Sequence, residues 1–256
     1  MKHSAKVLYF LSKKAENAEG QTGTEACNLD NALSVLCREF SNFMDDIVGK
    51  EILDFGCGVG WQAIAIAKNG ANFVIGIDTN QVNLKRAKEL SSEYGLDGKV
   101  AFMEKLDECC KGRFDIIISQ NSMEHFKEPS EILERMKWAL HPNGKILITF
   151  GPPWFAPYGS HMYFFTRMPW VNILFSEKSV MDVRAQFRDD GARKYEEVES
   201  GLNKMSIRKF ERTLSSCGLK IQNKKYTGVR NINFLSEIPM IRELFTNHIS
   251  CVLAQE

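Results

Sequence analysis

The segment that most constrains the fold places three glycines directly behind an apolar run. It reads ILDFGCGVGW from Ile52 to Trp61, with Gly56, Gly58 and Gly60 at every second position. Glycine loses more conformational freedom on folding than any other residue, so such a cluster needs a tight turn or a close approach of the backbone to a ligand. The segment predicts a buried strand that ends in a sharp turn at a binding site. A glycine turn without a ligand is the competing interpretation.

Strand-like and helix-like segments alternate around this turn. We expect strands at 51–55, 72–78, 99–104, 114–119 and 145–150, and helices at 61–70, 81–95 and 129–140. Because the strands are almost continuously apolar, this alternation predicts an α/β fold with a parallel sheet covered on both faces.

The flanking regions complete a four-part organisation. An amphipathic helix is expected over 31–47, within an N-terminal helical segment spanning 1–48, and the binding core spans 49–150. Residues 151–205 are rich in aromatics and then in charges, which indicates an insertion after the fifth strand. The end of the core, 206–256, is expected to hold a helix, a strand, a short helix and a last strand.

Composition narrows the class of protein. The chain has 256 residues, 44% of them hydrophobic, and a net charge of +1, so it can bury a core and has no general attraction for nucleic acid. No apolar stretch is long enough for a secretory signal or a stable membrane insertion. The seven cysteines lack paired metal-ligand spacing, so we expect reduced thiols in a cytoplasmic protein and no metal site.

Four motifs in order resemble those of the class I S-adenosylmethionine-dependent methyltransferases, in the small-molecule, type 11-like branch. They are EILDFGCGVG, VIGID, RFDIIISQNSMEHF and ALHPNGKILIT, within about 50–150. A dinucleotide fold would instead show G-x-G-x-x-G, and Trp61 stands where its third small residue belongs. Asn143 replaces a usual glycine, and asparagine tolerates the left-handed turn expected there. The resemblance implies a Rossmann-like, doubly wound, mostly parallel seven-stranded sheet.

The resemblance also implies a cofactor site for S-adenosyl-L-methionine at the carboxyl ends of the strands. Asp54 is expected to order the glycine loop or to reach the methionine ammonium through water. Asp78 is expected to accept hydrogen bonds from the two ribose hydroxyls, although it could instead cap the helix that starts near Gln81. The remaining expected cofactor-binding residues are Gly56, Gly58, Gly60, Thr79, Leu106 beside adenine, and Gln120 beside the methionine part.

Histidines are the candidate bases for a hydroxyl acceptor. His161, in the insertion, is expected either to act as a general base with an ionisation near neutral pH or to hydrogen-bond within its loop. His125, in the EH segment, is the second candidate, with a structural role favoured. The aromatic side chains of the insertion could line an acceptor pocket, but most are expected to form its own small core. They are Trp154, Phe155, Tyr158, Tyr163, Phe164, Phe165 and Trp170.

These observations predict a methyltransferase that acts on a small molecule, a sugar or a glycan, most simply on oxygen. A quinone or lipid methyltransferase is the second hypothesis, and a non-catalytic cofactor-binding scaffold is the third. No basic stripe or amine-methyltransferase motif is present, so a nucleic-acid acceptor is not expected. The sequence does not identify the acceptor, the methylated atom or the oligomeric state.

Overall fold

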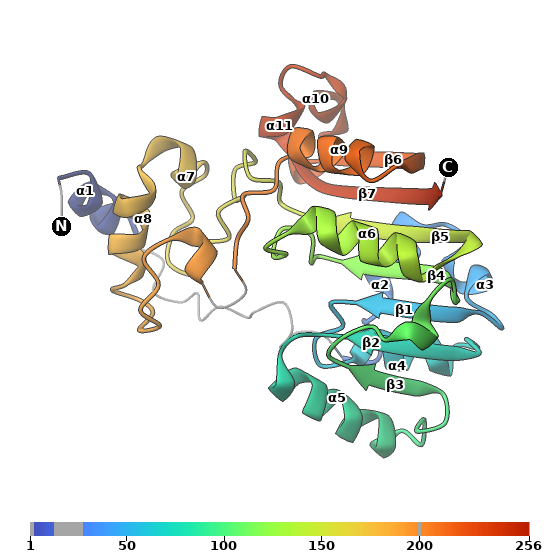
Figure 1. The fold of residues 1–256 in the computed structure, drawn as a ribbon. Helices are drawn as coiled ribbons and strands as arrows, with labels where there is room; N and C mark the ends of the chain where they lie inside the picture. The colour runs from blue at the N-terminus through green and yellow to red at the C-terminus, as the bar shows by residue number, and fades with distance from the viewer. Residues whose placement is uncertain (1–2, 13–27, 199–200, 256) are drawn as a thin grey trace.

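A seven-stranded sheet forms the centre of the computed structural model, which describes residues 3–12, 28–198 and 201–255 (Figure 1). The strand order is β3-β2-β1-β4-β5-β7-β6, and β7 alone runs antiparallel to its neighbours. The expected doubly wound, mostly parallel sheet is therefore confirmed. The strands are β1 (Glu51–Phe55), β2 (Phe73–Ile77), β3 (Val100–Met103), β4 (Phe114–Gln120), β5 (Leu140–Phe150), β6 (Leu219–Gly228) and β7 (Thr246–Gln255).

Helices cover both faces of the sheet. The short helices α2 (Ser34–Glu39) and α3 (Phe43–Asp46), with α4 (Trp61–Lys68) and α5 (Gln81–Glu93), pack on one face. Helices α6 (Pro129–Ala139) and α9 (Ile207–Ser216) pack on the other. Both faces of the central strands are thus buried, which is why their sequences are almost wholly apolar.

The single helix expected over 31–47 is wrong, because the structure breaks it into α2 and α3. Phe40 is extended, with φ −125° and ψ 97°, and Ser41 and Asn42 are residue types that compete with helical hydrogen bonding. The Glu39 carboxylate is also fixed from outside the helix, by Lys225 Nζ at 3.1 Å and Ser250 Oγ at 3.2 Å. The expected apolar face is nevertheless buried across the break.

Asn143 was expected in a left-handed turn before the fifth strand, but it lies within β5 (Leu140–Phe150). It does not adopt a left-handed conformation, and its backbone N–H donates to His141 Nδ1 at 3.2 Å. The residue that must be glycine here is Gly144, because a Cβ there would lie 2.9 Å from the carbonyl oxygens of Phe114 and Asp115.

The insertion forms a separate apolar cluster beyond the carboxyl ends of the strands (Figure 1). It contains α7 (Val171–Leu174) and α8 (Glu177–Arg184), and the N-terminal helix α1 (His3–Ser12) packs against α8. Ala5 and Leu8 of α1 are fully buried in this cluster. The N-terminal segment is thus divided, since α1 joins the insertion while α2 and α3 join the core.

Candidate functional site

The glycine turn connects β1 to α4 and is anchored to the end of β2. The N–H groups of Gly56 and Cys57 donate to the Ile77 carbonyl at 2.8 and 2.9 Å. All three glycines have positive φ, 86° at Gly56, 55° at Gly58 and 86° at Gly60, so the turn requires their conformational freedom.

Two of the glycines are also required by packing within the protein. A Cβ at Gly60 would lie 2.7 Å from the Phe102 ring and 2.8 Å from Ala87 Cβ. A Cβ at Gly56 would lie 2.5 Å from Ser122 Oγ. Close approach to a ligand is therefore not the only reason for the cluster, and Gly60 fits α4 against its neighbours.

Asp78 ties the glycine turn to the start of α5. Its Oδ2 accepts from the Gly58 N–H at 2.8 Å, and its Oδ1 accepts from the Asn80 N–H at 2.8 Å. The alternative role of Asp78 as the helix cap is wrong, because Asn80 Oδ1 accepts from the N–H groups of Val82 and Asn83. Each carboxylate oxygen has a second lone pair, so Asp78 can still accept from a ligand. Its neighbour Thr79 is exposed.

Asp54 places a buried carboxyl group with one free oxygen behind the turn. Gln62 Nε2 donates to Oδ1 at 2.6 Å, whereas Oδ2 is buried and has no partner among the described residues. Burial raises the pKa of Asp54 to about 7, and repulsion from Asp78 adds to the rise. A cationic ligand at Oδ2 would stabilise the ionised form.

Gln120 supplies a second buried, unpartnered acceptor on the adjacent strand. It ends β4, and its Oε1 has no hydrogen-bond partner among the described residues. Buried polar atoms are normally hydrogen-bonded, so two orphaned oxygens at one edge of the sheet indicate that a polar ligand completes this site. S-adenosylmethionine fits, because its ammonium group is a hydrogen-bond donor with a positive charge. Leu106, expected beside adenine, is half-buried against the core.

A cluster of three titratable side chains lies where the insertion meets β4 and β5. The rings of His125 and His161 meet edge to face, with centroids 5.6 Å apart. A ring nitrogen of His125, Nδ1, is 2.7 Å from the Gly201 carbonyl oxygen, which fixes its orientation. Glu124 was not among the site residues expected from the sequence, but its side chain is buried and its Oε2 has no partner among the described residues. The EH pair in the sequence was the available signal.

His161 has the features of a neutral base. Its Nε2 is buried and unpartnered in the described part of the chain, and burial together with repulsion from His125 lowers its pKa to about 4. The expected ionisation near neutrality is therefore wrong, because desolvation outweighs the hydrogen bond to the Pro152 backbone. His161 also has a φ of 55°, and such strained conformations are common at functional sites.

Only three of the seven aromatic residues named from the sequence belong to the insertion's own core, so the expectation that most of them would is wrong. Phe165 is fully buried, Trp154 and Phe164 pack against the same cluster, and Tyr158 contacts Tyr163 edge to face with centroids 5.0 Å apart. Phe155 and Tyr163 remain exposed.

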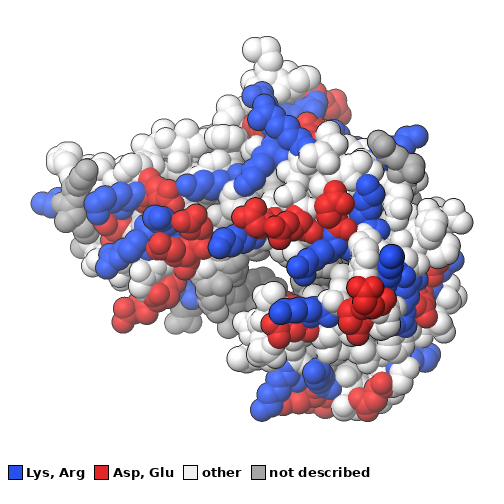
Figure 2. Space-filling view, viewed as in Figure 1, with Lys and Arg blue, Asp and Glu red and all other residues white. Residues whose placement is uncertain are grey.

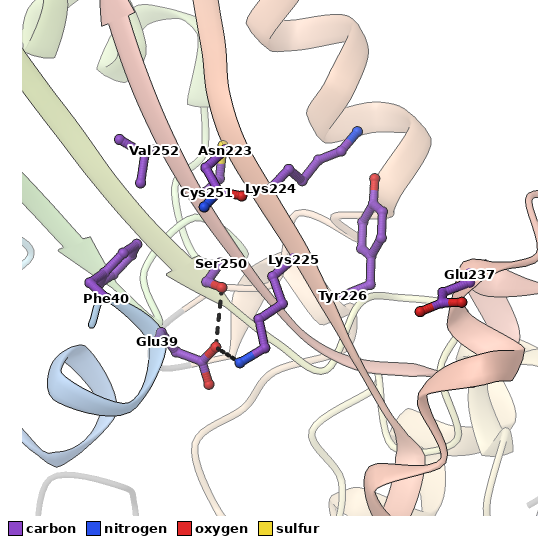
Figure 3. Close-up of a pocket in the computed structure, with 10 residues that line it drawn as sticks. All are labelled: Glu39, Phe40, Asn223, Lys224, Lys225, Tyr226, Glu237, Ser250, Cys251 and Val252. Atoms are coloured by element: carbon purple, nitrogen blue, oxygen red, sulfur yellow. Dashed lines mark hydrogen bonds and ion pairs between the residues drawn. The ribbon is translucent and has the colours of Figure 1, made fainter. Parts of the chain in front are cut away.

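Two other features lie apart from this site. A pocket of about 420 Å³ sits between α2, β6 and β7, where Lys225 and Ser250 hold Glu39 (Figure 3), and none of the predicted site residues lines it. Asp107, Cys109 and Cys110 bring three potential metal-ligand atoms within 4.8 Å of one another. In the structure both thiols instead donate to Asp107 Oδ1.

Comparison with known proteins identifies the family of the core. Residues 53–148 match the family model described as a methyltransferase domain. A ubiquinone biosynthesis O-methyltransferase of Idiomarina loihiensis is 34% identical over 110 residues, which cover 42% of this chain and 45% of the relative. A ribosomal protein L11 methyltransferase of Photobacterium profundum is 32% identical over 114 residues, 44% of this chain and 37% of the relative. The chain thus matches less than half the length of these curated relatives.

Solved structures share the fold over most of the chain. An S-adenosylmethionine-dependent methyltransferase from Mesorhizobium loti has a TM-score of 0.57 at 18% identity, covering 88% of this chain and 99% of that one. The [4+2]-cyclase SpnF also has a TM-score of 0.57, at 16% identity, covering 88% and 80%. Residues 53–148 thus match the methyltransferase-domain family, and the chain has the fold of solved S-adenosylmethionine-dependent methyltransferases.

Proposed function

We propose that this protein is an S-adenosylmethionine-dependent methyltransferase that methylates a hydroxyl oxygen of a small molecule. The observation that carries the acceptor side of this proposal is the buried Nε2 of His161, which lies beside His125 and has no partner among the described residues. A neutral imidazole in a dry site can accept the proton that a hydroxyl loses as it attacks a methyl group.

Different residues bind different parts of the cofactor. Asp78 orders the glycine turn and offers acceptor lone pairs to ribose hydroxyls. Asp54 and Gln120 offer their free oxygens to the amino-acid end of the cofactor. When bound, S-adenosylmethionine supplies a methyl group already activated by its sulfonium, so the main tasks of the protein are alignment and proton removal.

The acceptor-side residues hold and move the proton. His161 accepts the hydroxyl proton at Nε2, and the low pKa keeps this nitrogen free at neutral pH. The contact of His125 Nδ1 with the Gly201 carbonyl oxygen holds the His125 ring in place beside His161. The insertion, 151–205, covers these groups, and we propose that it acts as a lid that excludes water.

A variant pair tests the role of His161. Methyl transfer to a panel of hydroxyl acceptors is measured for the parent, His161→Gln and the control His248→Gln. His248 is a suitable control because it also has a buried, unpartnered Nε2 and a lowered pKa, but it lies on β7 beside Glu39. Only His161→Gln should lose turnover, and equal losses in both variants would contradict a base at His161.

A quinone or lipid acceptor is the second candidate, favoured by the O-methyltransferase relatives named for ubiquinone biosynthesis. The first candidate, a sugar or glycan, rests on the sequence resemblance alone. A role without methyl transfer is the third candidate, because this fold also occurs in SpnF, a protein named as a cyclase. Cofactor binding without methyl transfer to any acceptor in the panel would favour that role.

A further inference from the structure

The connection between β6 and β7 presents an exposed apolar surface. Residues 229–245 contain the short helices α10 (Asn233–Glu237) and α11 (Arg242–Phe245). Met240 is 92% exposed and Phe234 is 64% exposed. With Ile232, Ile238 and Leu244, which are also exposed, they form the apolar tip of the connection. Clustered apolar exposure of this kind marks an interaction site.

The part of the chain that carries this tip is basic. Residues 206–255 hold eight Lys and Arg against three Asp and Glu, although the whole chain has a net charge of only +1. Glu211 and Glu243 are engaged internally, whereas the third acid, Glu237, is exposed within the tip. Glu211 accepts from Lys224 and Tyr226, and Glu243 accepts from the N–H groups at the start of α9. Among the bases, Lys224 pairs with Glu211 and Lys225 with Glu39. Arg230, next to the tip, is exposed.

The tip lies at the same edge of the sheet as the candidate site. Both β5 and β6 run antiparallel to β7, so Phe150 and Gly228 leave the sheet at one edge. The Trp170 ring of the insertion contacts Phe245 of α11, with centroids 6.2 Å apart. In the view of Figures 1 and 2, α10 and α11 form the top of the molecule, where uncharged atoms protrude above a mixture of basic and acidic side chains.

We propose that this connection docks the protein on an anionic lipid bilayer. The apolar side chains of Phe234 and Met240 would enter the interfacial region, and the basic residues behind them would face lipid headgroups. Among the described residues no helix is long and apolar enough to cross a membrane, and surface docking does not require one. Docking would bring the acceptor site to a membrane-borne hydroxyl compound, a consequence that rests on the proposed function.

Co-sedimentation with vesicles tests the docking. The complete chain is mixed with vesicles of phosphatidylcholine alone or with phosphatidylglycerol added, in the absence of cofactor and acceptor. We compare the parent, the double variant Phe234→Ser with Met240→Ser, and the control Val82→Ser. Val82 is 77% exposed on α5, which lies at the opposite end of the sheet (Figure 1).

The parent and Val82→Ser should bind the anionic vesicles, and the double variant should bind at least about tenfold more weakly. Binding of S-adenosylhomocysteine should be equal in all three proteins, which shows that the core remains folded. Failure of the parent to bind anionic vesicles, or equal binding by the double variant, would overturn the proposal. If the double variant loses self-association but still binds vesicles like the parent, the docking proposal would also be overturned. The tip would then be a contact between copies of the chain. Because the assay contains no methyl donor, its failure is distinct from a failure of the proposed function.

Discussion

Replacing Asp54 by Asn should make the protein more stable at alkaline pH and a weaker cofactor binder. Asp54 is 1% exposed, and its carboxyl group receives a single hydrogen bond from the described part of the chain, from Gln62. An amide oxygen can accept the same bond, so the substitution removes the charge and retains the local contact.

The magnitude follows from the raised pKa. Burial moves the pKa of Asp54 from 3.8 to about 7, which corresponds to about 4 kcal/mol of unfavourable free energy for the ionised form. Because the folded-state pKa is the higher one, the folded protein binds more protons than the unfolded chain between these values. The free energy of unfolding therefore falls as pH rises from about 4 to about 7, and levels off above that range.

Unfolding by denaturant at several pH values, without ligand, checks this reasoning. Relative to the parent, Asp54→Asn should gain up to about 4 kcal/mol between pH 4 and pH 8. The exposed Asp45→Asn serves as a matched control and should show no such gain. A difference between Asp54→Asn and the parent that is the same at pH 4 and pH 8 would refute the assignment of the raised pKa to Asp54.

Ligand titrations complete the test. A cationic group near Oδ2 favours the ionised carboxylate, so S-adenosylhomocysteine should bind the parent more tightly as pH rises toward about 7, with proton release. Asp54→Asn should lose this pH dependence and bind about ten- to a hundredfold more weakly at pH 8. If Asp54→Asn binds S-adenosylhomocysteine as tightly as the parent, Asp54 is not part of the cofactor site.

Further predictions concern the remaining parts of the site. Asp78→Ala should weaken S-adenosylmethionine and S-adenosylhomocysteine by roughly 1.5–3 kcal/mol in calorimetry, and parent-like affinity would contradict its placement. His161→Ala should lower turnover by at least about 10²-fold with cofactor affinity retained, and the parent pH profile should show an acid limb near pH 4 that the variant lacks. Gly60→Ala should lower the free energy of unfolding by about 1–3 kcal/mol, because a Cβ would overlap Phe102 and Ala87; denaturant unfolding measures it. Hydrogen exchange over 151–205 should slow when cofactor and acceptor bind, and unchanged exchange would count against a lid.

The core of the fold was predictable because its signals are local. Continuous apolar strands, a glycine turn and helix stops such as Gly70 each act over a few residues, and α4 ends two residues before that glycine. Asp78 could likewise be placed at the end of the second strand from its position alone. The two hydrogen bonds that Asp78 accepts from backbone N–H groups could not be predicted, since they depend on the conformation of the glycine turn and of the start of α5.

Features that depend on distant contacts could not be predicted. The break after Glu39 reflects hydrogen bonds from β6 and β7, more than 180 residues away in the chain. The pKa of His161 depends on its burial and on the nearby His125, and Glu124 becomes notable only when its carboxylate is seen to be buried. The packing of α1 against α8 likewise leaves no local signal in either helix.

Product analysis tests the central claim most directly. The purified chain is incubated with S-adenosylmethionine carrying an isotopically labelled methyl group and a panel of sugar, phenol and quinol acceptors, and the products are examined by mass spectrometry. One class of acceptor should gain the label on a hydroxyl oxygen, and Asp78→Ala and His161→Gln should diminish this product. Tight cofactor binding without label on any acceptor, or label on nitrogen or carbon alone, would contradict the central claim.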